Sequence, residues 1–173
     1  MNTRLKELVD YIDAQLMLLR SAYESVPANR RALRPSPDRW SAAEVVHHVA
    51  IVEKRVVQRL KGLVEEARAL GRDQDESPLL AAIDTRKVSE RTARFKTSEL
   101  GEPRDTDPTT VWDELEATRR ALKEVIASAE GVPLGKVTAP HPALGAVNGY
   151  EWIAFTGSHA ARHADQIRED ATI

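Results

Sequence analysis

The sequence predicts an all-α fold, a four-helix bundle with a long crossover connection between its second and third helices. Four stretches carry apolar residues at helical spacing, and two of them open with a capping-box pattern. Strand signals are nearly absent, because the β-branched residues are scattered at helical spacing. Residues 72–107 form a longer connection than an up-down-up-down bundle needs, which favours a crossover. We expect residues 1–173 to form a single domain.

The first helix is predicted over residues 3–26. Its apolar side chains fall on one stripe, and "PANRRALRPSPDR", which contains three prolines, ends it. The members of this stripe are Leu5, Leu8, Val9, Ile12, Leu16, Leu19 and Tyr23.

The second helix begins in "WSAAEV", where Ser41 is the expected N-cap and Glu44 its capping-box partner. Trp40 and Val45 occupy the flanking positions of a hydrophobic staple, and Gly71 is the expected stop. In the following connection, "SPLLAAIDTRKV" is predicted to form a short helix, and "KTSELGEPRDTDPTT" reads as a loop.

The third and fourth helices carry start signals of their own. Asp107 is the expected N-cap of the third helix, with Pro108 in its first turn, and "EGVPLG" ends that helix. The fourth helix opens in "VNGYEW", with Asn148 as N-cap and Glu151 as box partner. One face of the fourth helix carries Trp152, Phe155, His159, His163 and Gln166.

Composition limits the classes of function. The chain has no cysteine, so disulfides, thiolate metal ligands and a cysteine nucleophile are excluded, and any metal must be held by nitrogen and oxygen. The net charge is -2 and no basic stripe is interleaved with aromatics, which argues against nucleic acid. The first ten residues lack a signal-peptide core, and no apolar run is long enough to span a membrane. We expect a cytoplasmic protein.

Two histidines on the fourth helix are the first candidate for a site. His159 and His163 lie four residues apart, which places both imidazoles on one helical face. Trp152 and Phe155 share that face, so we expect it to point into the core, where each imidazole needs a polar partner. A divalent cation satisfies both rings but needs at least one more ligand.

The second helix offers that ligand in "EVVHHVA". Its core stripe is centred on Val45, Val52 and Val56. With a rotation of about 100° per residue, His48 falls on the shoulder of the stripe, whereas His47 falls near the opposite face. We therefore predict that His48 is the third ligand and that His47 is solvated.

Three histidines from two helices leave an open coordination position, which is typical of catalytic metal sites. A cation in such a site lowers the pKa of a bound water, thiol or alcohol. The competing interpretation is that the histidines are core residues hydrogen-bonded to their neighbours. The protein would then be a non-catalytic bundle that binds a protein partner or a small apolar ligand.

Further side chains are candidates for catalysis or substrate binding, and most of them have an alternative role. Glu44 is a candidate catalytic or ring-orienting carboxylate, although it also completes the capping box. Gln166 is three residues from a ligand and can reach the site. His141, in the Pro/Gly-rich "APHPALGAV", contacts either substrate or the loop backbone. Arg55 and Arg59 either clamp an anionic substrate or extend into solvent.

Two blocks of sequence resemble the DinB/YfiT-like superfamily. "WSAAEVVHHVAIVE" is similar to its second-helix signature, and "HPALGAVNGYEWIAFTGSHAARHADQI" is similar to its C-terminal signature, with a His-Pro-x-x-Gly loop and an HxxxHxxQI ending. The two blocks cover roughly a quarter of the chain, and the order of the four helices fits the remainder.

The resemblance implies a divalent metal, usually zinc or nickel, held by His48, His159 and His163. It also implies a small-molecule substrate and an activity among hydrolases or thiol-dependent S-transferases and isomerases that use low-molecular-weight thiols. Dimers are frequent in the superfamily, so we expect a homodimer.

Overall fold

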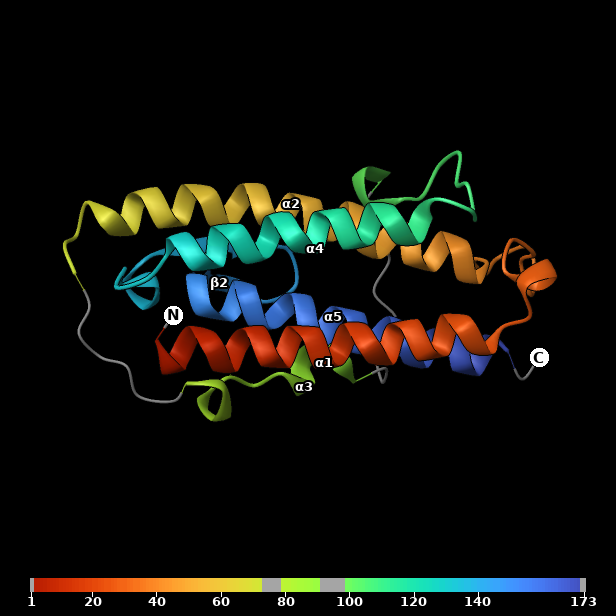
Figure 1. The fold of residues 1–173 in the computed structure, drawn as a ribbon, viewed down its shortest axis with the longest axis horizontal. Coiled ribbons are helices and arrows are strands. Elements are labelled where there is room, and N and C mark those ends of the chain that lie inside the picture. Colours follow the sequence, from red (N-terminus) through yellow and green to blue (C-terminus); the bar gives the residue numbers. More distant parts are fainter. Residues whose placement is uncertain (1, 73–78, 91–98, 172–173) are drawn as a thin grey trace.

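Four long helices build the molecule, as the sequence predicts. The computed structural model describes residues 2–72, 79–90 and 99–171. In Figure 1, α1 lies along α5 on one side of the bundle and α2 lies along α4 on the other, while contacts between α2 and α5 join the two pairs. The bounds of these helices are Thr3–Ser25 for α1, Ala42–Arg68 for α2, Val111–Ser128 for α4 and Gly149–Asp170 for α5.

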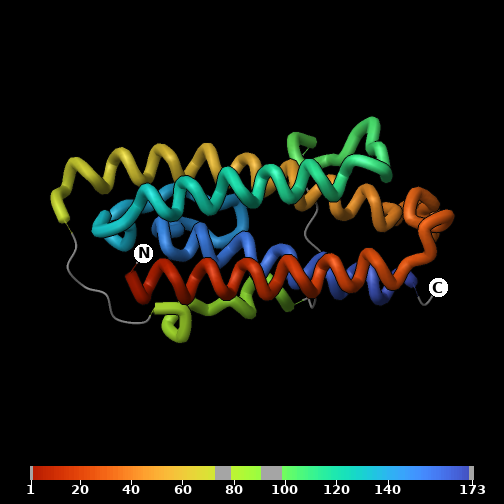
Figure 2. The backbone as a smooth tube through the Cα atoms, viewed as in Figure 1, coloured from red at the N-terminus to blue at the C-terminus, as the bar shows by residue number. Residues whose placement is uncertain are grey.

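The crossover between α2 and α4 is confirmed. In the described part of the connection, residues 79–90 lie against α1 and α5, and η3 (Glu99–Gly101) lies against α2; α2 and α4 run parallel (Figures 1 and 2). Within the described part of this connection are the 3-10 helix η2 (Leu80–Ala82), the one-turn α3 (Arg86–Ser89) and the 3-10 helix η3 (Glu99–Gly101). The single short helix expected in "SPLLAAIDTRKV" is therefore two separate turns, and part of the predicted loop lies outside the described residues.

Helix starts agree with the sequence in two cases and differ in one. Both capping boxes form: Ser41 with Glu44 at the start of α2, and Asn148 with Glu151 at the start of α5. Asp107 does not cap α4, which begins four residues later. Its carboxylate instead accepts hydrogen bonds from the backbone N–H and hydroxyl of Thr109 in a local turn.

A short hairpin between α4 and α5 is absent from the prediction. The 3-10 helix η4 (Leu134–Lys136) leads into β1 (Thr138–His141), which pairs antiparallel with β2 (Gly145–Asn148). Strands of four residues, one of them containing a proline, are too short for an alternating pattern to stand out. The turn uses the positive φ of 77° at Gly145, which favours glycine.

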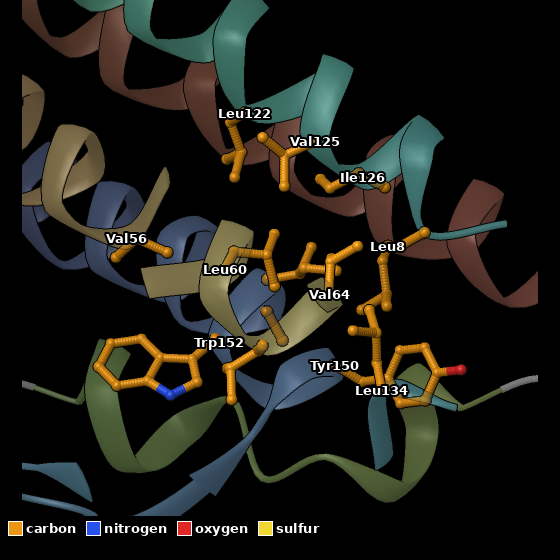
Figure 3. Packing of buried hydrophobic residues seen from close by; sticks show 14 of the residues in the cluster. Leu8, Val56, Leu60, Val64, Leu122, Val125, Ile126, Leu134, Tyr150 and Trp152 are labelled. Carbon is orange, nitrogen blue, oxygen red and sulfur yellow. The ribbon is translucent and has the colours of Figure 1, made fainter. Parts of the chain in front are cut away.

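The core fills the space between the helix pairs. Figure 3 shows aliphatic side chains from α1, α2 and α4 meeting beside Tyr150 and Trp152 of α5. A buried ion pair crosses this interior: the guanidinium of Arg119 donates to both carboxylate oxygens of Glu53, at 2.7 and 2.9 Å, and also to the carbonyl of Ile12. This network joins α1, α2 and α4, and such pairs persist only when their hydrogen bonds are satisfied.

Within the described residues, no helix combines the length and hydropathy needed to cross a bilayer.

Candidate metal centre

The structure brings the three predicted histidines together. His48 from α2 and His159 and His163 from α5 each offer a ring nitrogen, and these atoms lie within 4.8 Å of one another. The rings of His159 and His163 are 4.4 Å apart between centroids, and that of His48 is 4.8 Å from His163. His48 and His163 are buried, while His159 is half-buried and forms the more accessible side of the cluster.

Hydrogen bonds at Nδ1 set the tautomers of His48 and His163. Nδ1 of His48 lies 2.6 Å from the carbonyl oxygen of Gly101, and Nδ1 of His163 lies 2.8 Å from Oε1 of Gln166. A carbonyl or amide oxygen can only accept, so each Nδ1 carries the proton. The Nε2 atoms of both rings therefore keep their lone pairs.

This donor set fits a divalent ion. Nε2 of His163 lies 3.1 Å from Nε2 of His159. Two nitrogen ligands of a tetrahedral zinc ion are separated by roughly 3.4 Å, given Zn–N distances near 2.0–2.1 Å. Neutral imidazoles oriented through Nδ1 are also the usual form of histidine ligands. The spacing of His159 and His163 therefore fits two ligands of one ion, and the ring nitrogen of His48, within 4.8 Å of theirs, would complete a set of three with one position open.

Burial favours the neutral form of His48 and of His159. Burial lowers the pKa of His48, although the hydrogen bond to Gly101 opposes the shift. Burial, followed by the neighbouring His163 and His48, holds the pKa of His159 well below its ordinary value. Neutral rings are ready to coordinate a cation without first losing a proton.

A row of aromatic rings surrounds the cluster. Trp40 packs on His48 at 4.9 Å between centroids, and Phe155 stacks on His159 at 5.3 Å. Beyond Phe155, the ring of His141 lies 4.7 Å from Phe155 and 5.3 Å from Trp152. The metal centre therefore has an apolar wall that reaches the hairpin.

Glu44 does not orient the ring of His48. Its carboxylate accepts hydrogen bonds from the Arg34 guanidinium and from the backbone N–H of Ser41. Partial burial raises the pKa of Glu44, but these hydrogen bonds outweigh burial and lower it. The carboxylate thus serves the start of α2, and Gly101 takes the orienting role beside His48.

The other candidates fall in different places. Gln166 lies in the site, hydrogen-bonded to His163. His141 is half-buried beside Phe155, at the end of β1 rather than in a loop, and its Nδ1 accepts from the turn backbone. Arg55 and Arg59 are exposed, which agrees with the alternative that they extend into solvent.

His47 corrects the expectation of a solvated side chain. It is half-buried, and its Nδ1 lies 2.8 Å from the hydroxyl oxygen of Thr106. The predicted helical phase is right, since His47 points away from the cluster. The returning crossover nevertheless packs against this face of α2, a contact that helical phase alone does not reveal.

The crossover supplies two contacts that sequence reasoning missed. Gly101 in η3 orients His48 with a backbone carbonyl, a group present at every residue and therefore without a sequence signal. Arg162, next to His163, donates to the carbonyl oxygens of Val88 and Glu90. The connection is thus attached to both helices that carry the metal ligands.

Comparisons with known proteins agree with this architecture. The crystal structure of TT2238, a four-helix bundle protein, matches with a TM-score of 0.64 over 95% of this chain and 98% of that chain, at 19% sequence identity. This likeness concerns the fold. The uncharacterized protein YuaE of Bacillus subtilis (strain 168) is 29% identical over 137 residues, which cover 79% of this chain and 80% of YuaE.

The family model of the DinB superfamily matches residues 11–167, nearly the whole of the four-helix bundle and all three clustered histidines. With this match, the chain belongs to the DinB superfamily.

Proposed function

We propose that the protein binds a divalent metal ion, zinc or nickel, through His48, His159 and His163, and uses it on a small-molecule substrate. The observation that carries the proposal is the convergence of three ring nitrogens within 4.8 Å, with Nδ1 of two of the rings held by oxygen acceptors. A core role accounts for the 3.1 Å hydrogen bond between Nε2 of His163 and Nε2 of His159, but it does not require a third ring nitrogen, from His48 on another helix, to join them.

The proposed chemistry is hydrolysis or thiol-dependent group transfer. A divalent ion in this site would supply a Lewis acid that lowers the pKa of a bound water or thiol. The chain's own contribution is to orient the ligands through Gly101 and Gln166 and to keep the ring nitrogens unprotonated. The rings of Trp40 and Phe155 pack on His48 and His159 and give the cluster an apolar lining.

Metal analysis with a matched pair of variants tests this proposal. Protein purified without a histidine tag and offered zinc or nickel is expected to bind close to one ion per chain. His48→Ala is expected to abolish uptake, because the remaining two ligands come from α5 alone. His47→Ala is the control: it removes the adjacent imidazole of the same helix, which contacts Thr106 and not the cluster.

Activity assays then separate the two reaction classes. A panel of small esters and amides, and of electrophiles with a low-molecular-weight thiol, is screened with the metal-loaded protein. Turnover that disappears in His48→Ala and persists in His47→Ala supports the proposal that the protein is a metal-dependent enzyme. Equal metal content in wild type and His48→Ala contradicts the metal site and favours a non-catalytic bundle.

A further inference from the structure

Trp152 carries a buried hydrogen-bond donor without an acceptor. Its side chain is 6% exposed, and its Nε1 is the one buried side-chain nitrogen or oxygen without a partner among residues that the structure describes. In Figure 3 the nitrogen edge of the indole points away from Val56 and Leu60. Buried donors in native proteins are nearly always paired, so an unpaired one calls for an acceptor that the chain itself does not provide.

His141 presents a second donor, on a ring whose centroid lies 5.3 Å from that of Trp152. Its Nδ1 accepts the backbone N–H groups of Ala143 and Leu144, at 3.1 and 3.2 Å. An accepting Nδ1 is unprotonated, so the neutral ring must carry its proton on Nε2. Burial lowers the pKa of His141, which favours this neutral form. No hydrogen bond to Nε2 forms within the described part of the chain, and the ring is 5.3 Å from that of Trp152.

Both donors adjoin the metal centre through a single ring. Phe155 contacts His141 at 4.7 Å and Trp152 at 5.7 Å, and it stacks on the ligand His159 at 5.3 Å. Phe155 therefore links the two donors to the histidine cluster. The N–H donors of His141 and Trp152 are therefore placed to bind the end of a substrate that lies away from the metal.

The two donors favour an acceptor that carries negative charge. Both open positions are N–H groups, so they match a ligand group that only accepts, and a carboxylate offers two such oxygens. Hydrogen bonds to charged acceptors are also stronger than those to neutral ones.

We propose that Nε2–H of His141 and Nε1–H of Trp152 bind the carboxylate of the small-molecule substrate. This inference rests on the proposed function for its substrate, but the two donors themselves belong to the hairpin and to the first turn of α5. Their preference for a carboxylate is therefore present with or without the metal. The substrate class that follows is an organic acid whose other end reaches the metal.

Pairs of isosteric probes measure this preference. Acetate is compared with acetamide, and benzoate with benzamide, by calorimetric or nuclear magnetic resonance titration of zinc-loaded and metal-free protein. We expect at least one acid to bind about tenfold more tightly than its amide, the effect of one charge-assisted hydrogen bond. Equal affinities of both acids and their amides in both forms of the protein would overturn the inference.

Variants of the two donors separate binding from folding. His141→Asn keeps an acceptor for the turn amides through Oδ1 but loses the Nε2 donor, whereas His141→Gln can place a donor near the lost one. Trp152→Phe keeps an aromatic ring without N–H. We expect about a tenfold loss of acid affinity in His141→Asn and in Trp152→Phe, recovery in His141→Gln, and unchanged metal content and melting temperature in His141→Asn.

The outcomes distinguish this inference from the proposed function. Normal metal uptake with acid affinities that both His141→Asn and Trp152→Phe leave unchanged contradicts the carboxylate site and leaves the metal site standing. Absence of metal uptake contradicts the proposed function. In that case the titrations of metal-free protein still decide whether the two donors prefer an acid over its amide.

Discussion

At the residue scale, a single hydrogen bond at Nδ1 of a clustered histidine sets the orientation of its ring. His163 donates from Nδ1 to Gln166, which lies one helical turn further along α5. This contact keeps Nε2 of His163 unprotonated and directed at Nε2 of His159. Gln166 is therefore a positioning residue, one that acts on the metal through its neighbour.

Replacing Gln166 is expected to weaken metal binding without removing a ligand. Gln166→Leu deletes the acceptor, frees the ring of His163 to rotate or change tautomer, and is expected to lower metal affinity roughly 10- to 100-fold. Gln166→Glu retains an acceptor and is expected to preserve affinity. Competition with a chromophoric chelator measures both, and equal affinities for Leu and Glu variants would show that the contact has no orienting role.

At the scale of the element, two helical glycines have opposite surroundings. A Cβ on Gly157 of α5 would meet Cε1 of Tyr11 at 2.5 Å, so this glycine permits the close packing of α1 on α5. The hydroxyl of Tyr11 also lies 3.0 Å from Oγ of Ser158, which holds the two helices in register. A Cβ on Gly62 of α2 would meet nothing within 4 Å.

The same substitution at these two positions is expected to change stability in opposite directions. Gly157→Ala forces α1 and α5 apart and is expected to lower the free energy of unfolding by about 1–3 kcal/mol. Gly62→Ala adds a good helix former on an exposed face and is expected to raise it by up to about 1 kcal/mol. Urea unfolding of both variants checks this, and destabilisation by Gly62→Ala would show an unrecognised constraint on α2.

At the scale of the whole molecule, two neutral histidines, the buried His48 and the half-buried His159, make stability depend on pH. The pKa values of His48 and His159 are lowered by burial in the folded protein, so below pH 6.5 the unfolded chain binds protons that the folded chain does not. The free energy of unfolding of metal-free protein is therefore expected to fall as the pH drops from 6.5 toward the lower folded values. The slope is at most about 1.4 kcal/mol per pH unit for each histidine.

Urea titrations of metal-free protein between pH 7.5 and 5.5 measure that slope. His159→Phe removes one of the titrating groups and is expected to reduce the slope, whatever it does to stability at neutral pH. His47→Phe is the comparison from outside the cluster. A slope that His159→Phe leaves unchanged would contradict burial of a neutral imidazole at this position.

The sequence by itself determined the four helices and the three histidines that cluster. Apolar periodicity and two capping boxes are local properties, so they could be read at Ser41 and Asn148 without knowing what the helices pack against. Helical phase likewise separated His48 from His47, because rotation about a helix axis depends only on position along the chain.

Only the tertiary structure decided which groups surround that cluster. The carbonyl of Gly101 reaches His48 from 53 residues away, and His47 meets Thr106 across a similar distance in sequence. The hairpin that ends at His141, and the later start of α4, depend on strand pairing and a local turn that leave little periodic signal. The contacts of Gly101 and Thr106 join segments remote in sequence, and they are set by the path of the crossover rather than by any local pattern.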